Sequence, residues 1–597
     1  MHRVAYVLTM AALLITPLHA AEKKCELQQL AQLPVTMSGS QPIITGTING
    51  KPVKFLVDTG AFWSLLARDT VTRLQLHEGA LPYGLSISGV GGTESAGYTK
   101  ANEFSLIGFY GGHIFNGMDF IVSGSAVFSD IDGIIGQNVI GRDDAEYDLA
   151  NGVIRLFKAS GCNDHSLAYW RGNTSVAEMS LKRRTAADPH WISEAKLNGK
   201  NIRVLFDSGA SFSVLNRTVA AKLGITPESA RATTAGTTSG IGLRSVELSL
   251  ARFDTLDLGG EVTRNARIRF GDVSGRMIAD LTLGIDFLLS HRIYFSSSQN
   301  KLYFTYNGGP VFDLRPKSTD REAAVISPVI ADTLGDTTEK TQASAADLRR
   351  RGAATASRGD ARTAVDLLNQ AVTLDPDDAE NFYERGKANL QNKQPQLALA
   401  DFDQAIKLNP AHVAALIDRG AMHLASKDET AARVDFEAAL QINPNDPDDA
   451  LRIANIYEGF GFHSEAINRY TAWINANPKS GELPNVLNGR CWARAMLGNE
   501  LDQALSDCNL ALKKGSSNSI VLDSRAFVYL RQGNYDKSIA DYKTVLKLQP
   551  KKAFSMYGLG VAESRKGLKT DSELHVKNAV MLMPNVADFY NSLALLP

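Results

Sequence analysis

Hydrophobic and polar residues follow one pattern in the first half of the chain and another in the second. Between about residues 35 and 310, short stretches alternate with a period of two and are separated by Gly and Asn, which is typical of β-strands. Asn49-Gly50 and Asn198-Gly199 each lie between two such stretches, a strong signal for a tight hairpin. From residue 343 onward, hydrophobic residues recur at helical spacing. The pattern predicts a mainly-β part followed by an all-α part.

The β part contains the same unit twice. Ile-Asn-Gly-Lys-Pro-Val-Lys-Phe-Leu-Val ends at Asp58, and Leu-Asn-Gly-Lys-Asn-Ile-Arg-Val-Leu-Phe ends at Asp207, 149 positions later. Further along, Ile134-Ile135-Gly136 is matched by Thr282-Leu283-Gly284 at an offset of 148. Because the unit recurs with almost no net insertion, the sequence indicates an internal duplication. We expect two related lobes, over residues 22–165 and 166–313.

The helical part has a regular period. Pro376, Pro410, Pro444 and Pro478 are spaced 34 residues apart, and so are Pro550 and Pro584. A helix–turn–helix period of 34 residues is typical of tetratricopeptide repeats (TPR), and about seven repeats fit into residues 343–597. The segment 314–342 is rich in Thr, Asp, Glu, Ser and Pro and is predicted to be a linker. Such a solenoid is expected to bind a protein partner.

Composition narrows the class of protein. With 597 residues the chain needs several domains, and a net charge of −1 without long charged blocks gives no indication of nucleic-acid binding. Residues 1–21 have the basic start, apolar stretch and small terminal residues of a secretory signal, so we expect export, with the periplasm as the destination. No later segment is apolar enough to predict a membrane span. No Cys or His cluster has metal-ligand spacing, so neither a metal nor a cofactor is expected.

The four cysteines fit an oxidising compartment. Cys25 and Cys162 bracket the first lobe, and Cys491 and Cys508 are placed to face each other from two antiparallel helices. Both pairs are therefore disulfide candidates. Four buried free thiols are the alternative.

The strongest candidate chemistry lies at the end of two apolar strands. The first reads Asp58-Thr59-Gly60-Ala61 and the second Asp207-Ser208-Gly209-Ala210. Two carboxyl groups close together cannot both ionise, so they titrate as a pair that can take a proton from water and give one to a carbonyl oxygen. Gly60 and Gly209 permit a tight turn, and Ala61 and Ala210 are small enough not to crowd a site.

These residues resemble the retropepsin-like aspartic proteases over roughly residues 35–310. That family has an Asp-Thr/Ser-Gly-Ala turn, a Gly-rich flap hairpin, and two hydrophobic residues before a Gly-x-Asp/Asn segment, here Gly136-Gln137-Asn138 and Gly284-Ile285-Asp286. The resemblance implies that Asp58 and Asp207 are catalytic and that the hydroxyls of Thr59 and Ser208 lock the turns together. It also implies that the lobes pair within one chain and that two flaps close over an extended peptide. The flap candidates are Gly89, Gly91 and Gly92 in the first lobe and Gly236, Ser239 and Gly240 in the second.

The sequence therefore predicts an exported aspartic endopeptidase whose TPR array recruits a substrate or partner. The alternative is a non-catalytic peptide-binding scaffold with an inactive protease fold. A further alternative is that each lobe pairs with its equivalent in another chain. The histidines lack a Ser or Cys partner in a recognisable motif and are interpreted as structural or surface residues: His77, His113, His165, His190 and His291.

Overall fold

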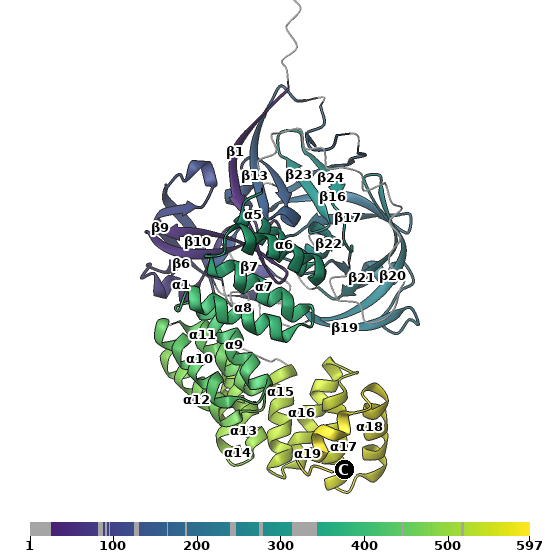
Figure 1. Ribbon diagram of the computed structural model, residues 1–597. Coiled ribbons are helices and arrows are strands. Elements are labelled where there is room, and N and C mark those ends of the chain that lie inside the picture. Colours follow the sequence, from purple (N-terminus) through teal and green to yellow (C-terminus); the bar gives the residue numbers. More distant parts are fainter. Residues whose placement is uncertain are drawn as a thin grey trace, which may run out of the picture.

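A computed structural model describes residues 25–312 and 343–596 (Figure 1). Within these ranges it leaves out residues 82–86, 90–91, 95, 125–130, 164, 173, 186–187, 239–245, 274–278, 445, 479 and 515–518. The expected signal peptide and linker lie outside the described residues. The first range is mainly β and forms two lobes, and the second is a run of helices.

Lobe 1 is built on an eight-stranded sheet with the order β2-β3-β4-β11-β5-β10-β9-β6. Phe55, Phe104 and Phe120 pack together at its core, with ring centroids 5.6 to 6.2 Å apart. The strands and helices are β2 (Thr36–Ser38), β3 (Gln41–Ile48), β4 (Lys51–Val57), β5 (Leu65–Ala67), α1 (Arg68–Arg73), β6 (Gly79–Ala80), β9 (Gly97–Leu106), η1 (Phe109–Gly111), β10 (Phe115–Ser123), β11 (Gly133–Ile135) and α2 (Gln137–Ile140).

Lobe 2 repeats this topology strand for strand, in the order β15-β16-β17-β22-β18-β21-β20-β19. Even the extra pairing of β3 with β9 has its counterpart between β16 and β20. The duplication seen in the sequence is therefore a duplication of the fold. The elements are β15 (Lys182–Thr185), β16 (Asp188–Leu197), β17 (Lys200–Phe206), β18 (Val214–Asn216), α3 (Arg217–Lys222), β19 (Ala232–Thr238), β20 (Val246–Leu258), β21 (Glu261–Gly271), β22 (Leu281–Leu283) and α4 (Ile285–Leu288).

A third sheet contains strands from both lobes, in the order β1-β13-β12-β23-β24-β14. Its central pairing is antiparallel and aligns Tyr147 of lobe 1 with Ile293 of lobe 2. A disulfide between Cys25 and Cys162 lies at its outer end. The bounds are β1 (Glu26–Pro34), β12 (Asp144–Asp148), η3 (Leu149–Asn151), β13 (Val153–Ser160), β14 (Ala177–Ser180), β23 (His291–Ser296) and β24 (Lys301–Tyr306).

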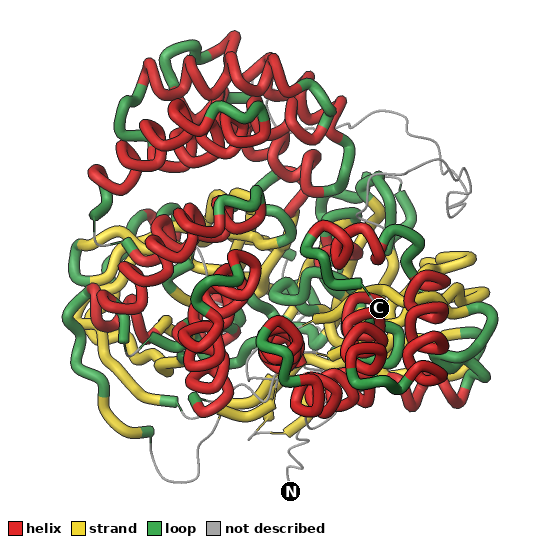
Figure 2. The backbone as a smooth tube through the Cα atoms, turned by 90° about the horizontal axis from the view of Figure 1, so that it is seen from below, coloured by secondary structure: helices red, strands yellow, loops and turns green. Residues whose placement is uncertain are grey.

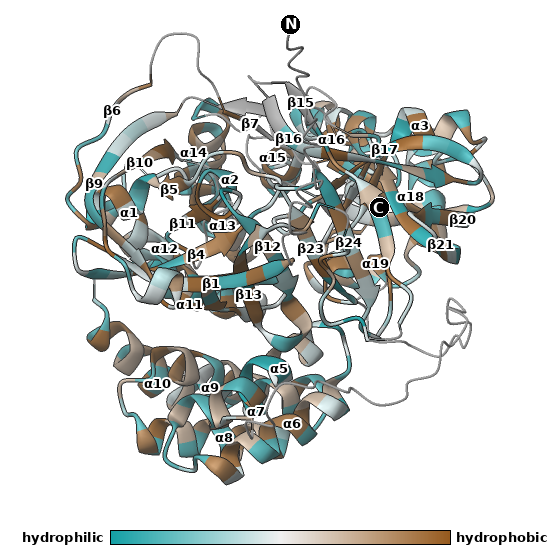
Figure 3. Cartoon of the chain, turned by 90° about the horizontal axis from the view of Figure 1, so that it is seen from above, coloured by the Kyte–Doolittle hydropathy of each residue, from teal (hydrophilic) through white to brown (hydrophobic). Residues whose placement is uncertain are grey.

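The second range forms seven helix pairs, from α5/α6 to α17/α18, followed by α19. Brown hydrophobic and teal hydrophilic residues alternate along α5 to α10, as expected of helices with one packed face (Figure 3). The helices are α5 (Ala345–Ser357), α6 (Ala361–Leu374), α7 (Ala379–Gln391), α8 (Pro395–Leu408), α9 (Val413–Ala425), α10 (Glu429–Ile442), α11 (Pro447–Gly459), α12 (His463–Ala476), α13 (Leu483–Leu497), α14 (Leu501–Lys513), α15 (Ser519–Arg531), α16 (Tyr535–Leu548), α17 (Ala553–Arg565), α18 (Lys569–Leu582) and α19 (Val586–Ser592).

Recurring contacts hold several of the helix pairs together. Gly386 lets an aromatic ring approach closely, because a Cβ there would lie 2.6 Å from the Phe402 ring. A partly buried Arg of the first helix also pairs with a buried Asp of the second in several repeats, as Arg419 does with Asp435 at 2.6 Å. The same pairing joins Arg385 to Asp401, Arg490 to Asp507 and Arg525 to Asp541. A second disulfide, Cys491–Cys508, links α13 to α14.

The solenoid is packed against the β part through α5 and also through the segment before α13. Ala354 of α5 is fully buried in the same hydrophobic core as both lobes. Further along, the Ser480 hydroxyl donates a hydrogen bond of 2.8 Å to Asp69 on α1. Seen from below, the helices lie across the strand-rich part (Figure 2). Among the described residues no helix has the length and apolar character needed to cross a membrane.

Candidate functional site

The two aspartate turns face each other where the lobes meet. Asp58 follows β4 and Asp207 follows β17, both of which are inner strands of their sheets. The backbone N–H of Asp58 donates to the carbonyl of Ile135 on β11, and that of Asp207 donates to the carbonyl of Leu283 on β22. Each aspartate is thus attached to two neighbouring strands, which hold it rigidly.

Two hydroxyl groups lock the turns together. Thr59 Oγ1 donates to the carbonyl oxygen of Phe206 at 2.8 Å, and Ser208 Oγ donates to that of Val57 at 2.7 Å. Each hydroxyl also accepts a hydrogen bond from the other residue's backbone N–H, at 2.9 and 3.0 Å. Thr59 and Ser208 are both buried. The four bonds make the position of one aspartate depend on that of the other.

The glycines bring the turns close enough for the carboxyl groups to interact. A Cβ on Gly60 would lie 2.5 Å from Asp207 Cγ, and a Cβ on Gly209 would lie 2.4 Å from Asp58 Cγ. Any side chain at either position would occupy the space of the opposite carboxyl group. Ala61 has no such conflict and instead donates its backbone N–H to Asp58 Oδ1 at 2.9 Å.

The two carboxyl groups are hydrogen-bonded to each other and titrate as a pair. Burial, followed by the negative charge of Asp207, raises the pKa of Asp58 well above its usual value. Burial also raises the pKa of Asp207, opposed by hydrogen bonds from Asp58 and from the backbone of Gly209 and Ala210. The pair therefore retains one proton at a pH where isolated aspartates have lost theirs.

The Gly-x-Asn/Asp segments hold in place the stretch of chain that follows each aspartate turn. In lobe 1, both the backbone N–H and the hydroxyl of Ser64 donate to Asn138 Oδ1, at 2.9 and 2.8 Å. In lobe 2, Ser213 makes the same two bonds to Asp286 Oδ1, at 2.7 and 2.6 Å. Burial raises the pKa of Asp286 to about 6, although Ser213 and Arg269 oppose this.

The predicted flap residues are described only in part. In lobe 1, β7 (Ile87–Gly89) and β8 (Gly92–Glu94) form a two-stranded hairpin in which Gly89 pairs with Gly92. In lobe 2, Gly236 lies in β19 with a φ of 85°, a conformation that favours glycine. Gly91, Ser239 and Gly240 lie outside the described residues.

Sequence reasoning missed one residue beside the paired turns. His190, at the start of β16, lies with Nε2 2.9 Å from the carbonyl oxygen of Gly60. Its charge also lowers the pKa of Asp207. The sequence predicts His190 to be a structural or surface residue, because it has no partner in a recognisable motif. The sequence indicates only that His190 lies on the strand before the Asn198-Gly199 hairpin, one strand ahead of the second turn.

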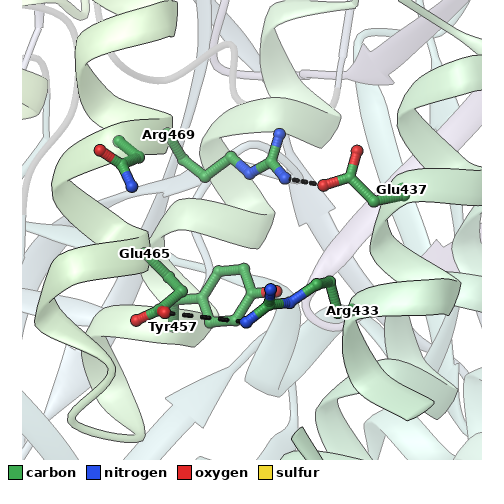
Figure 4. Close-up of a pocket in the computed structure, with 6 residues that line it drawn as sticks. Arg433, Glu437, Tyr457, Glu465 and Arg469 are labelled. Carbon is green, nitrogen blue, oxygen red and sulfur yellow. Dashed lines mark hydrogen bonds and ion pairs between the residues drawn. The ribbon is translucent and has the colours of Figure 1, made fainter. Parts of the chain in front are cut away.

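A separate hollow of about 200 Å³ lies in the solenoid, between α10, α11 and α12. Figure 4 shows that its charged residues pair with one another: Arg469 with Glu437, and Arg433 with Glu465 at 4.0 Å. This hollow contains no part of the aspartate turns. Within the described part of the chain, no group of three or more His, Cys, Asp or Glu residues is arranged to hold a metal ion.

Comparison with known families agrees with the division of the chain into a two-lobed β part and a helical part. Residues 44–139 and 193–287 each match the aspartyl protease family. Residues 349–402, 383–449 and 519–552 match tetratricopeptide repeat families. The protein is a fusion of two tandem aspartyl protease-like units and a TPR solenoid. Each of the two units contains one of the aspartates, so the paired site is made from both matches.

Solved structures with detectable similarity include several TPR proteins. A tetratricopeptide repeat protein from Parabacteroides merdae ATCC 43184 is 19% identical, with a TM-score of 0.28 over 40% of this chain and 84% of its own. Yeast Tom70 is 18% identical, with a TM-score of 0.29 over 41% of this chain and 50% of its own. YrrB, described as a TPR protein with an unusual peptide-binding site, is 15% identical, with a TM-score of 0.25 over 32% of this chain and 97% of its own. A search of curated proteins gave no match.

Proposed function

We propose that the protein is an aspartic endopeptidase whose single site uses Asp58 and Asp207 of the same chain. The observation that carries the proposal is the hydrogen-bonded carboxyl pair at the centre of the two interlocked turns. The turns leave no room for a side chain between the carboxyl groups, so the close approach of the two acids is built into both lobes.

The chemistry follows from the shared proton. A peptide carbonyl is a poor electrophile, and its hydrolysis needs both an activated water and a proton donor. The ionised carboxyl takes a proton from water, while the protonated one donates to the carbonyl oxygen. The raised pKa values of Asp58 and Asp207 keep one proton on the pair under mildly acidic conditions.

The substrate class is an extended peptide segment, with Gly-rich strands from the two lobes on either side of it. An extended chain pairs with such strands through its backbone, and its alternate side chains enter pockets. The solenoid is the recruiting element, since it is fixed to lobe 1 through Ser480 and Asp69. A protein bound to the solenoid is thereby held near the cleft at a high effective concentration.

We further propose that the chain is exported to an oxidising compartment, the periplasm. The N-terminal sequence and the cysteine pairs Cys25–Cys162 and Cys491–Cys508 support this. Cell fractionation followed by thiol labelling tests it. We expect protein shortened at its N-terminus and without reactive thiols, and a reduced cytoplasmic protein of full length would contradict the proposal.

The function itself is tested with a diverse peptide library between about pH 4 and pH 7. The proteins compared are the wild type, the double variant Asp58→Asn/Asp207→Asn, and Asp366→Asn, which alters an exposed aspartate of α6. We expect cleavage by the wild type and the Asp366 variant and none by the double variant. Capture of peptides without any cleavage by folded wild type would favour the scaffold alternative.

A further inference from the structure

The two lobes differ at a position next to the paired carboxyl groups. Lobe 2 has His190 at the start of β16, where the 149-residue offset places Gln41 at the start of β3 in lobe 1. Only an ionisable residue can place a full charge beside the pair. The two sides of the site are therefore electrostatically unequal at this position.

The contact made by His190 has a defined direction. Its Nε2 lies 2.9 Å from the carbonyl oxygen of Gly60, and because a carbonyl oxygen only accepts, Nε2 carries the hydrogen. Gly60 in turn lies against the carboxyl group of Asp207. His190 therefore comes from lobe 2, contacts the turn of lobe 1, and acts through that turn on the aspartate of its own lobe.

We propose that His190 is a positioning residue: its ring holds the Gly60 turn of lobe 1 against the carboxyl group of Asp207. This inference rests on the proposed function. The electrostatics agree with this placement, because the charge of His190 lowers the pKa of Asp207 against the larger, opposite effect of burial. A further titratable group near the pair is Tyr147 of β12, whose pKa is raised by burial and then by the charge of Asp58.

Two variants separate the hydrogen bond from the charge. His190→Gln supplies the residue that lobe 1 has at this position and keeps an N–H donor without a cation, whereas His190→Leu removes both. We expect His190→Leu to lower kcat by about 10-fold to 100-fold with little change in KM, since the turn is misplaced. We expect His190→Gln to recover most of this loss. In both variants the acid limb of the kcat/KM profile should move to higher pH, because Asp207 then ionises less readily.

His77→Gln, at an exposed histidine of lobe 1, is the control and should match the wild type. An unchanged acid limb in both His190 variants, or an unchanged kcat in His190→Leu, would overturn the inference.

If the wild type cleaves nothing, the proposed function fails and His190 is tested without turnover. The readout is then infrared titration of the protonated carboxyl band that disappears in Asp58→Asn/Asp207→Asn. That band should persist to higher pH in His190→Gln than in the wild type, and equal titration would refute the inference.

Discussion

Gly60 lies directly against the carboxyl group of Asp207, so that a Cβ at position 60 would come within 2.5 Å of Asp207 Cγ. The Gly60→Ala variant must therefore displace the carboxyl group from its partner. Because small misplacements of reacting groups lower rates strongly, we expect kcat to fall by roughly 100-fold or more. Peptide cleavage is the measurement. Gly79→Ala is the control, since its nearest neighbour would be 3.9 Å away, and wild-type activity in Gly60→Ala would contradict this geometry.

The hydroxyl of Thr59 makes two of the four bonds that lock the turns. Thr59→Val keeps the shape of the side chain but leaves the buried carbonyl of Phe206 and the buried N–H of Ser208 without this partner. Unpaired buried groups cost about 1–3 kcal/mol each, so the loss of two partners should lower the free energy of unfolding by about 2–6 kcal/mol. Denaturant unfolding followed through β-sheet signals measures it. Thr59→Ser keeps the hydroxyl, as Ser208 does in lobe 2, and should lose much less; equal losses in the two variants would refute the lock.

Asp286 should make stability depend on pH. Its pKa is about 6 in the folded protein and lower when unfolded, so the folded state binds the extra proton between about pH 4 and pH 6. The contribution of Asp286 to the free energy of unfolding is fully present below pH 4. As the pH rises to 6, the free energy of unfolding falls by up to about 3 kcal/mol. Asp286→Asn should remove that slope, and Asn138 shows that an amide oxygen accepts the same two bonds. The difference in Tm between wild type and variant, measured from pH 4 to pH 7, tests this, and a constant difference would contradict it.

The disulfide Cys491–Cys508 should stabilise the helical part. It joins residues 17 positions apart in sequence, and both cysteines are buried between α13 and α14. A loop of this length corresponds to about 3 kcal/mol. Replacing both cysteines by Ala should lower the helical unfolding midpoint, measured by circular dichroism, and a reductant should do the same to the wild type. Replacing Cys25 and Cys162 is the control, because that pair lies in the β part and should leave the helical transition unchanged.

Much of this architecture follows from local sequence signals. The two aspartate turns, the hairpins at Asn49 and Asn198 and the 34-residue period each reflect residues close together in the chain. Because the duplicated units keep almost the same length, equivalence between positions could be read directly from the offset. That equivalence is sufficient to predict that Asp58 and Asp207 form one site.

The parts that were missed depend on contacts between distant segments. His190 reaches Gly60 only because the two lobes face each other, and no pattern around residue 190 indicates this. Likewise, Ala354 is an ordinary helix residue in the sequence, yet it is buried in the core of the lobes. The contact of Ser480 with Asp69 spans 411 positions. Such contacts arise from the docking of whole units, which hydrophobic periodicity does not encode.

The most direct test of the account compares Asp58→Asn and Asp207→Asn, assayed separately and as an equal mixture, with the wild type on one cleaved peptide. If one site uses both aspartates of a single chain, the wild type cleaves, whereas each variant alone and the mixture are inactive. Cleavage by either single variant would show that one aspartate is sufficient or that each lobe pairs with its equivalent in another chain. Activity restored by mixing would show that the site forms between chains. Either result would contradict the account.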